Sequence, residues 1–383
     1  MITWQTSSAT ALEVQSVLSD KSSMAKTLSD LRKEIDAVDT DLLRLLNQRA
    51  QLAHEVGELK RAEGSAVFRP ARELQVINAL QVANAGPLKS DNISNIWREI
   101  MSACRSLESD QRVAYLGPTG TFSEQAAIGF FGSSMARVPC PSIDEVFRAT
   151  AAGSADFGVV PIENSSEGVI SRSLDLLLHS PLHIVGETSL LVRHNLLRLE
   201  PAIEGIEVVL AHPQALAQCQ QWLNAHLPNA ERRAASSNAE GARLAASNPA
   251  WAAIASERAG SEFGLHTVSK AIQDDASNRT RFAIVCLPQT MAAPEATGKD
   301  CVSLAVSVTN RAGAVHDLLV PLKRHGVSMT RFESRPARSG QWEYYFYIDL
   351  EGHPTQPAVQ MALDELRQLC AFYKVLGTYP LGS

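Results

Sequence analysis

Apolar residues near the start of the chain repeat every seven positions and form a stripe along one predicted helix. Nine leucine, isoleucine and valine residues fill its two seam positions: Leu28, Leu31, Ile35, Val38, Leu42, Leu45, Leu52, Val56 and Leu59. No proline interrupts the stripe, so it predicts one helix of about 35 residues, roughly 50 Å long. Thr27 and Asp30 resemble a capping box at its start, and Gly64 marks its end.

Arg49 occupies the remaining slot of this stripe. A charge in an apolar seam is costly unless a carboxylate of the chain or an anionic ligand pairs with it. Lys60 lies about 16 Å away on nearly the same face, so the two side chains can converge on one small anion. Arg32 lies about 42 Å from Lys60 and reaches that anion only from a second, antiparallel helix. Alternatively, Arg32 and Lys60 are solvated charges on a coiled-coil flank.

Three segments with different patterns follow a flexible tail at 1–23. Residues 24–110 are all-helical, with further helices at about 69–84 and 91–108. From residue 112, short β-rich runs alternate with helical stretches, which indicates an open α/β domain over 111–290. The runs are Val113–Leu116, Phe157–Val160, Glu207–Leu210, Trp251–Ile254 and Phe282–Val285. After a linker at 289–300, residues 300–381 read strand, helix, strand, strand, helix, strand, which suits an α+β ferredoxin-like sandwich.

Composition narrows the possible functions. The net charge of −6 argues against a nucleic-acid binder. No apolar run is long enough to span a membrane, and the first residues do not form a signal peptide, so we expect a cytoplasmic protein. The six cysteines are scattered without a CxxC pair, so we expect neither a disulfide framework nor a metal site, and no cofactor.

The helical segment resembles the all-helical chorismate mutase family in its runs Leu31–Asp36 and Arg69–Glu73, and in the pair Arg49 and Lys60. The resemblance implies a helix-swapped homodimer in which four cations hold the dicarboxylate of chorismate, one of them serving the site of the partner chain. These cations are Arg32, Arg49, Lys60 and Arg72, with Arg32 reaching the partner's site. It also implies that Glu73 lies near the substrate hydroxyl.

Glu108 stands where this family places a Gln or Glu against the ether oxygen of the substrate. A pericyclic rearrangement needs a compact conformer and stabilisation of charge on that oxygen, which Lys60 and Glu108 would supply. Because a carboxyl group donates only when protonated, we expect a raised pKa for Glu108 and mutase activity that falls above neutral pH. Arg69 and Cys104 depart from familiar members, which have Asp and Ser there.

The α/β segment carries three runs at predicted strand ends. Tyr115–Glu124 is a strand, a glycine-rich turn and a capped helix start, which either aims N–H groups at an anion or is an ordinary turn. Glu163, Asn164 and Ser165 end a strand that runs into a helix, at the edge where open sheets bind ligands. The third run, Asn278–Phe282, precedes the last strand.

Together these runs resemble the prephenate dehydratase family over residues 111–287. The resemblance implies two periplasmic-binding-protein-like subdomains, the second at about 190–262, with a cleft between them. It makes Thr280 the prime catalytic residue, which orients or relays a proton, beside Glu163 and Asn164. Substrate contacts would come from Ser165, Gln218 and Arg281, although Arg281 alternatively pairs within the fold. His212 is expected to start a helix, and Ala211 lacks the hydroxyl common there.

The last segment resembles the ACT regulatory domain of the same enzymes. Its two matching runs are Gly313–Ala314–Val315 and Glu333–Ser334–Arg335–Pro336. The resemblance implies allosteric binding of phenylalanine and feedback inhibition; alternatively, Glu333 and Arg335 are surface charges. The chain as a whole is interpreted as a bifunctional enzyme that converts chorismate to prephenate and prephenate to phenylpyruvate. A cytosolic amino-acid sensor is the alternative, whereas a fused dehydrogenase would need a GxGxxG turn that the chain lacks.

Overall fold

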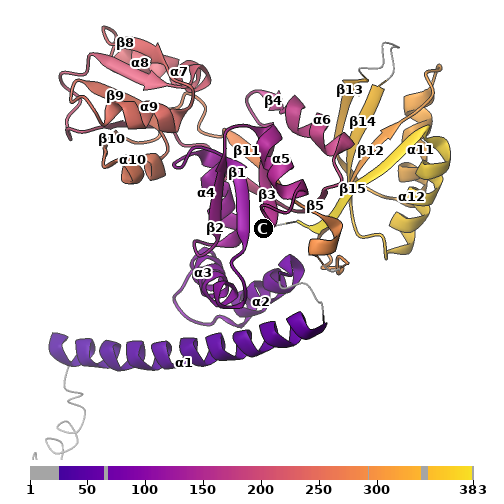
Figure 1. The fold of residues 1–383 in the computed structure, drawn as a ribbon, viewed down its shortest axis with the longest axis horizontal. Coiled ribbons are helices and arrows are strands. Elements are labelled where there is room, and N and C mark those ends of the chain that lie inside the picture. The colour runs from indigo at the N-terminus through magenta and orange to yellow at the C-terminus, as the bar shows by residue number, and fades with distance from the viewer. Residues whose placement is uncertain (1–25, 64–67, 292, 338–343, 382–383) are drawn as a thin grey trace, which may run out of the picture. The chain divides into compact units, whose positions relative to one another are not determined.

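The computed structural model describes residues 26–63, 68–291, 293–337 and 344–381 (Figure 1). The predicted tail at 1–23 and the predicted helix stop at Gly64 lie outside these residues. Contacts divide the chain into two compact units, with the boundary between Leu52 and Ala53.

The heptad stripe forms the helix α1, Leu28–Glu63, of 36 residues. The predicted capping box is present, because the Asp30 N–H donates to Thr27 Oγ1 at 3.2 Å and the Thr27 N–H donates to Asp30 Oδ2 at 3.1 Å. All nine seam residues of α1 remain between 43% and 65% exposed. An apolar stripe this long is unusual on the surface of a monomer.

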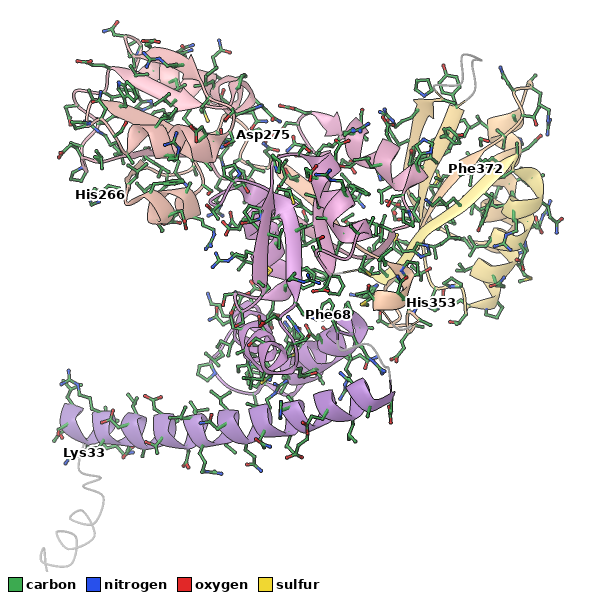
Figure 2. The ribbon with its side chains drawn as sticks, viewed as in Figure 1. Lys33, Phe68, His266, Asp275, His353 and Phe372 are labelled. Atoms are coloured by element: carbon green, nitrogen blue, oxygen red, sulfur yellow. The ribbon has the colours of Figure 1, made fainter. Side chains whose placement is uncertain are left out.

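Two shorter helices follow, α2 (Pro70–Ala83) and α3 (Ser90–Glu108), close to their predicted ranges. Phe68, just before α2, is only 2% exposed. Figure 2 labels Phe68. Its ring packs against Phe130, Phe131 and Phe157 of the α/β region, with centroids 5.2 to 6.1 Å apart. This aromatic contact anchors the start of α2 to the α/β core.

The α/β region contains two sheets, as expected for two subdomains. The first subdomain contributes β1 (Arg112–Leu116), β2 (Ala136–Cys140), β3 (Phe157–Asn164), β4 (Gly168–Val169), β5 (His183–Leu191) and β11 (Arg279–Cys286), with helices α4 (Phe122–Phe131), α5 (Ile143–Ala151) and α6 (Ser171–His179). The second sheet has the order β10-β6-β9-β7-β8. The strands of this sheet are β6 (Asn195–Arg198), β7 (Val208–Ala211), β8 (Glu231–Ala234), β9 (Trp251–Ala255) and β10 (His266–Ser269). The helices of the second subdomain are α7 (Pro213–Gln218), α8 (Gln220–His226), α9 (Asn238–Ala245) and α10 (Glu257–Phe263).

Three expectations for the α/β region are wrong in detail. The residues after Asn164 form a turn and the short strand β4, not a helix start, because Asn164 Oδ1 accepts hydrogen bonds from the N–H groups of Ser166 and Glu167. Strand β11 begins at Arg279, so Thr280 lies within the strand. The second sheet extends past residue 262 to β10, and the long strand β5 was not predicted.

The C-terminal elements follow the predicted order: β12 (Asp300–Ser307), α11 (Ala314–His325), β13 (Met329–Pro336), β14 (Tyr344–Glu351), α12 (Pro357–Leu369) and β15 (Phe372–Pro380). Helices α11 and α12 cover one face of the four strands (Figure 1). The other face packs on α6 of the first subdomain, where Ala305 and Tyr347 share a core with Leu174 and Leu177. The short helix η1 (Pro288–Thr290) overlaps the start of the predicted linker at 289–300.

The four C-terminal strands continue the sheet of the first subdomain, in the order β13-β14-β12-β15-β5-β11-β3-β1-β2. The joint is a single residue pair, Gly377 of β15 opposite Ile184 of β5. A Cβ atom at Gly377 would lie well inside van der Waals contact with the Ile184 carbonyl. The close approach of the two backbones therefore requires glycine at this position.

Candidate active sites

A cavity of about 510 Å³ lies between the two α/β subdomains and is lined by both. Its polar lining includes Thr121, Ser123, Asn164, Glu167, His194, His212, Gln218, Ser237, Asn238 and Thr280. The described residues that line it include no lysine or arginine. Positive potential comes instead from the N-termini of α4 and α9, which begin after the capping residues Thr121 and Ser237 at the cavity.

A chain of hydrogen bonds joins the predicted residues on the cavity wall. The Asn164 side-chain amide donates to Thr280 Oγ1 and to Asn278 Oδ1, both at 2.9 Å. Gln218 Oε1 in turn accepts from Asn278 at 3.2 Å and contacts His194 Nε2 at 2.9 Å. Thr280 Oγ1 accepts a hydrogen bond from Asn164, so its own hydroxyl hydrogen remains available to donate to a further partner.

His194 and Asn278 are members of this chain that the sequence did not single out as site residues. Both are almost fully buried, at 2% and 1% exposed. Burial lowers the pKa of His194, so its ring is neutral near pH 7. Because Gln218 Oε1 is an acceptor, we infer that Nε2 carries the hydrogen, which leaves the buried Nδ1 as an acceptor without a hydrogen-bond partner. His194 lies in a short connection between two strands and belongs to no motif, so the local sequence gives no sign of its role.

Ser165 and Glu167 each form a hydrogen bond with a member of this hydrogen-bonded chain. Ser165 Oγ accepts the Arg279 N–H at 2.9 Å and lies 3.4 Å from Asn278 Oδ1. Glu167 accepts a hydrogen bond from Gln218 at 3.3 Å. The structure therefore brings together Asn164, Ser165, Gln218 and Thr280 of the predicted site.

Glu163 and Arg281 point away from this cavity. Their side chains meet on the opposite face of the sheet, where Arg281 Nη1 donates to Glu163 Oε2 at 2.8 Å. Arg281 also donates twice to Glu187, at 2.8 and 2.7 Å. Of the two roles considered for Arg281, the structure shows pairing within the fold, and it does not bring Glu163 to the cavity.

The glycine-rich turn before α4 is only partly open to a ligand. Thr121 caps α4 as predicted, but Glu124 Oε2 accepts the Gly120 N–H at 2.7 Å, so the chain's own carboxylate occupies that donor. Glu124 is fully buried. Burial opposes its ionisation, yet hydrogen bonds from Arg258, Gly120 and Arg137 lower the pKa of Glu124 to about 2. His212 caps α7 through Nδ1, which confirms its predicted place at a helix start.

In the helical segment, Glu108 lies against the end of α1. A Cβ atom on Gly57 would be 2.7 Å from Glu108 Cγ, so glycine makes room for this side chain. Burial raises the pKa of Glu108, partly opposed by the charges of Lys60 and Arg105. This confirms the predicted direction. Glu108 Oε2 is buried without a hydrogen-bond partner.

The other predicted mutase residues are described within their own units. Glu73 forms an ion pair with the buried Arg105, which also donates to the Phe131 carbonyl. Arg72 lies 3.5 Å from Gln75 on its own helix. Within the N-terminal unit, Arg32 is exposed and Arg49 is half-buried.

The two runs predicted to bind phenylalanine flank α11 and end β13. Gly313 has φ +78° immediately before α11, Ala314 is buried, and Val315 is exposed. Arg335 pairs with Asp175 of α6 at 2.9 Å and also donates to Ser171, so it is not a solvated surface charge. Arg335 and Pro336 line a cavity of about 250 Å³ at this contact. Glu333 is half-buried, and Ser334 is exposed.

Comparison with known proteins agrees with this three-part organisation. Residues 31–109 match the family model Chorismate mutase type II, residues 113–290 match Prephenate dehydratase, and residues 302–368 match ACT domain. The chain is 47% identical to a bifunctional chorismate mutase/prephenate dehydratase of Neisseria gonorrhoeae, over 93% of this chain and 99% of the relative. The chain belongs to this family. It therefore combines chorismate mutase and prephenate dehydratase activities with an ACT domain, in phenylalanine biosynthesis.

Two further similarities agree with this assignment. The bifunctional enzyme of Pseudomonas aeruginosa is 42% identical over 92% of this chain and 97% of the relative. The structure of prephenate dehydratase from Arthrobacter aurescens in complex with L-Phe superposes with a TM-score of 0.65 at 33% identity, covering 70% of this chain and 89% of that one. Among the described residues, no helix is long and apolar enough to cross a membrane, and no group of acidic, His and Cys side chains is arranged to hold a metal.

Proposed function

We propose that the cavity between the dehydratase subdomains binds prephenate, with Thr280 and Asn164 as the catalytic pair. The reaction breaks the bond between the ring and the carboxylate carbon, which leaves as CO2. The electron pair of that bond makes the ring aromatic as hydroxide departs, and the departing hydroxide takes up a proton to leave as water. The Thr280 hydroxyl, oriented by the hydrogen bond from Asn164, donates toward the cavity and is the nearest candidate to relay that proton. This buried hydrogen-bonded pair is the observation that carries the assignment.

The same cavity suits a dianion although its lining has no side-chain cation. The N–H groups at the starts of α4 and α9 stabilise carboxylates, and Ser123 and Asn238 add polar groups beside them. We assign Gln218 and Ser165 to holding Asn278 and Asn164 in place, with Gln218 at the cavity surface.

For the mutase, we propose that two chains pair along α1. The nine seam residues are between 43% and 65% exposed in one chain, and pairing along α1 would remove this apolar surface from water, which favours association. An antiparallel partner brings the partner subunit's Arg32 to the site of Arg49, Lys60, Arg72 and Glu108, where the cations hold the substrate carboxylates and Glu108 donates to the ether oxygen.

For the ACT domain, we propose that phenylalanine binds beside Gly313–Val315 and Glu333–Pro336 and inhibits the dehydratase. The pairing of Arg335 with α6 supports this, because a ligand that moves β13 also moves a dehydratase helix.

The decisive assay supplies chorismate and follows phenylpyruvate, with and without phenylalanine. Thr280→Ala is expected to lower dehydratase kcat by 10²-fold or more, whereas its mutase rate stays at the wild-type value. Thr280→Ser, which keeps the hydroxyl, is the matched control and should retain a larger part of the activity. Normal dehydratase turnover by Thr280→Ala would overturn the role of this residue.

A further inference from the structure

Behind the Thr280–Asn164 pair, on the face of the sheet turned away from the cavity, five charged side chains form one cluster. Its members are Glu163, Glu187, Arg281, Arg331 and Asp349, hereafter the sheet-back cluster. Three come from the dehydratase strands β3, β5 and β11, and two come from the ACT strands β13 and β14. Their side chains are between 5% and 33% exposed, so solvent screens them only in part.

The cluster and the catalytic pair occupy the same two rungs of the sheet. In the antiparallel pairing of β3 with β11, Thr280 lies opposite Asn164, and Arg281 lies opposite Glu163. Successive residues of a strand point to opposite faces. Each catalytic side chain therefore has a cluster residue as its immediate neighbour in the chain, and a displacement of that neighbour moves the backbone that carries it.

Arg281 holds the dehydratase side of the cluster. It donates to Glu163 and to both oxygens of Glu187, and its contact with Asp349 Oδ2 is 3.3 Å. Burial lowers the pKa of Arg281, but the hydrogen bond and charge of Glu187 and the charges of Asp349 and Glu163 raise it overall. Asp349 is itself fixed, because Ser303 Oγ donates to its other oxygen at 2.6 Å. A guanidinium with its carboxylates arranged in this way is a rigid support for β11.

Arg331 faces two of the same carboxylates but reaches neither. Its Nε lies 3.6 Å from Glu163 Oε2, and its Nη1 lies 3.9 Å from Asp349 Oδ2, both too long for hydrogen bonds. The Nε and Nη2 groups of Arg331 are buried without a hydrogen-bond partner, which is unfavourable. A shift of less than about 1 Å would bring Arg331 Nε within hydrogen-bond distance of Glu163 Oε2, the same oxygen to which Arg281 Nη1 donates. Strand β13 also carries Glu333–Pro336, two residues further on.

We propose that Arg281 and Glu163 are positioning residues for Thr280 and Asn164, and that Arg331 competes with Arg281 for Glu163 when the ACT domain changes state. The exchange transmits the ACT state to the catalytic pair across the thickness of one sheet. The inference rests on the proposed dehydratase site and on its inhibition by phenylalanine.

The first test measures positioning in the full-length enzyme. In Arg281→Lys, one ammonium cannot bridge Glu163 and Glu187 as the planar guanidinium does. We expect dehydratase kcat to fall at least tenfold with the KM for prephenate changed less than threefold, because the substrate does not contact Arg281. Glu163→Gln should show the same split between kcat and KM. The mutase rate of each variant reports whether it folds. A raised KM with unchanged kcat in both variants would mean that these residues bind substrate, and would overturn the positioning role.

The second test measures transmission with Arg331→Gln. Phenylalanine should still bind, as followed by titration calorimetry, but the concentration that halves dehydratase activity should rise at least fivefold. The control is Arg324→Gln, which removes an arginine of the same domain that pairs with Glu365 at the surface and should leave inhibition unchanged. Wild-type inhibition in Arg331→Gln, with wild-type enzyme inhibited as proposed, would refute the exchange. A wild-type enzyme that phenylalanine does not inhibit would instead contradict the proposed function.

Discussion

The protonation of Glu108 should set the pH dependence of the mutase. Its carboxyl group is packed against Gly57 with Oε2 buried and unbonded, and burial raises its pKa. Only the protonated form donates a hydrogen bond to the ether oxygen. The substitution Glu108→Gln keeps the shape of the side chain and supplies an amide donor at every pH.

The size of the effect follows from the titration. Above its pKa, the protonated fraction of Glu108 falls about tenfold per pH unit. Mutase kcat/KM should therefore fall with a limiting slope of about one decade per pH unit, to a floor about 10²- to 10³-fold below the acid plateau, the usual value of one such donor. Glu108→Gln should remove this slope. The stability of the fold changes with pH in the same direction. Because the pKa of Glu108 is raised in the folded state, its stabilising contribution is complete below the unfolded pKa of 4.5 and is lost as the pH rises.

The assay follows chorismate consumption between about pH 5 and 9 for both proteins. Dehydratase activity of the same samples is the internal control and should have one pH profile in both. Melting temperatures should diverge in favour of Glu108→Gln as the pH rises. A mutase profile that Glu108→Gln leaves unchanged would refute the donor role of Glu108.

Three further predictions concern other parts of the chain. Val38→Asp places a charge in the exposed seam of α1 and should give monomers by light scattering that lack mutase activity but retain dehydratase activity. Thr40→Asp, which lies off the stripe, is the control and should leave the dimer and its mutase activity intact. Monomers with mutase activity would contradict the proposed dimer. Gly57→Ala should displace Glu108 and lower mutase kcat at least tenfold. The melting temperature should change little, because alanine gains about 1 kcal/mol of helix propensity. Full mutase activity would show that the contact between Gly57 and Glu108 is not needed. Since the pKa of Glu124 is lowered from 4.5 to about 2, its ion pairs contribute on the order of 3 kcal/mol that is present above pH 4.5 and lost as the pH falls toward 2. Glu124→Gln should thus melt lower at neutral pH and show a smaller loss in acid, and parallel pH curves for the two proteins would contradict this.

Much of the fold could be predicted from the sequence because it depends on local patterns of residues. The heptad stripe, Pro70 in the first turn of α2 and the alternating strands of the ACT domain each determine an element without help from distant residues. The strand β5 escaped prediction because Gly186 and Glu187 interrupt its apolar residues, so its sequence has neither alternation nor a continuous apolar run.

The residues of the candidate site were predicted less well than the fold, because the role of a residue depends on the direction of its side chain as well as on its position in the sequence. Glu163 and Asn164 are adjacent in one motif, yet the strand turns one to the cavity and the other to the sheet-back cluster. Strand β11, whose pairing with β3 sets Thr280 opposite Asn164, was predicted to start three residues too late. Asn278 joins the site through its contact with Gln218 of the other subdomain, and His194 joins through the same Gln218, 24 positions away, and no local pattern records either contact.

The joint at Gly377 has a consequence for modular evolution. Because β15 meets β5 at a single residue pair that tolerates no side chain, the ACT domain is not an appendage on a linker but an extension of the dehydratase sheet. An ACT domain transplanted onto another dehydratase would need to bring this glycine and a strand of matching register. Domains of this kind should therefore be inherited together with the sheet that they lengthen, and exchange between enzymes should be rare.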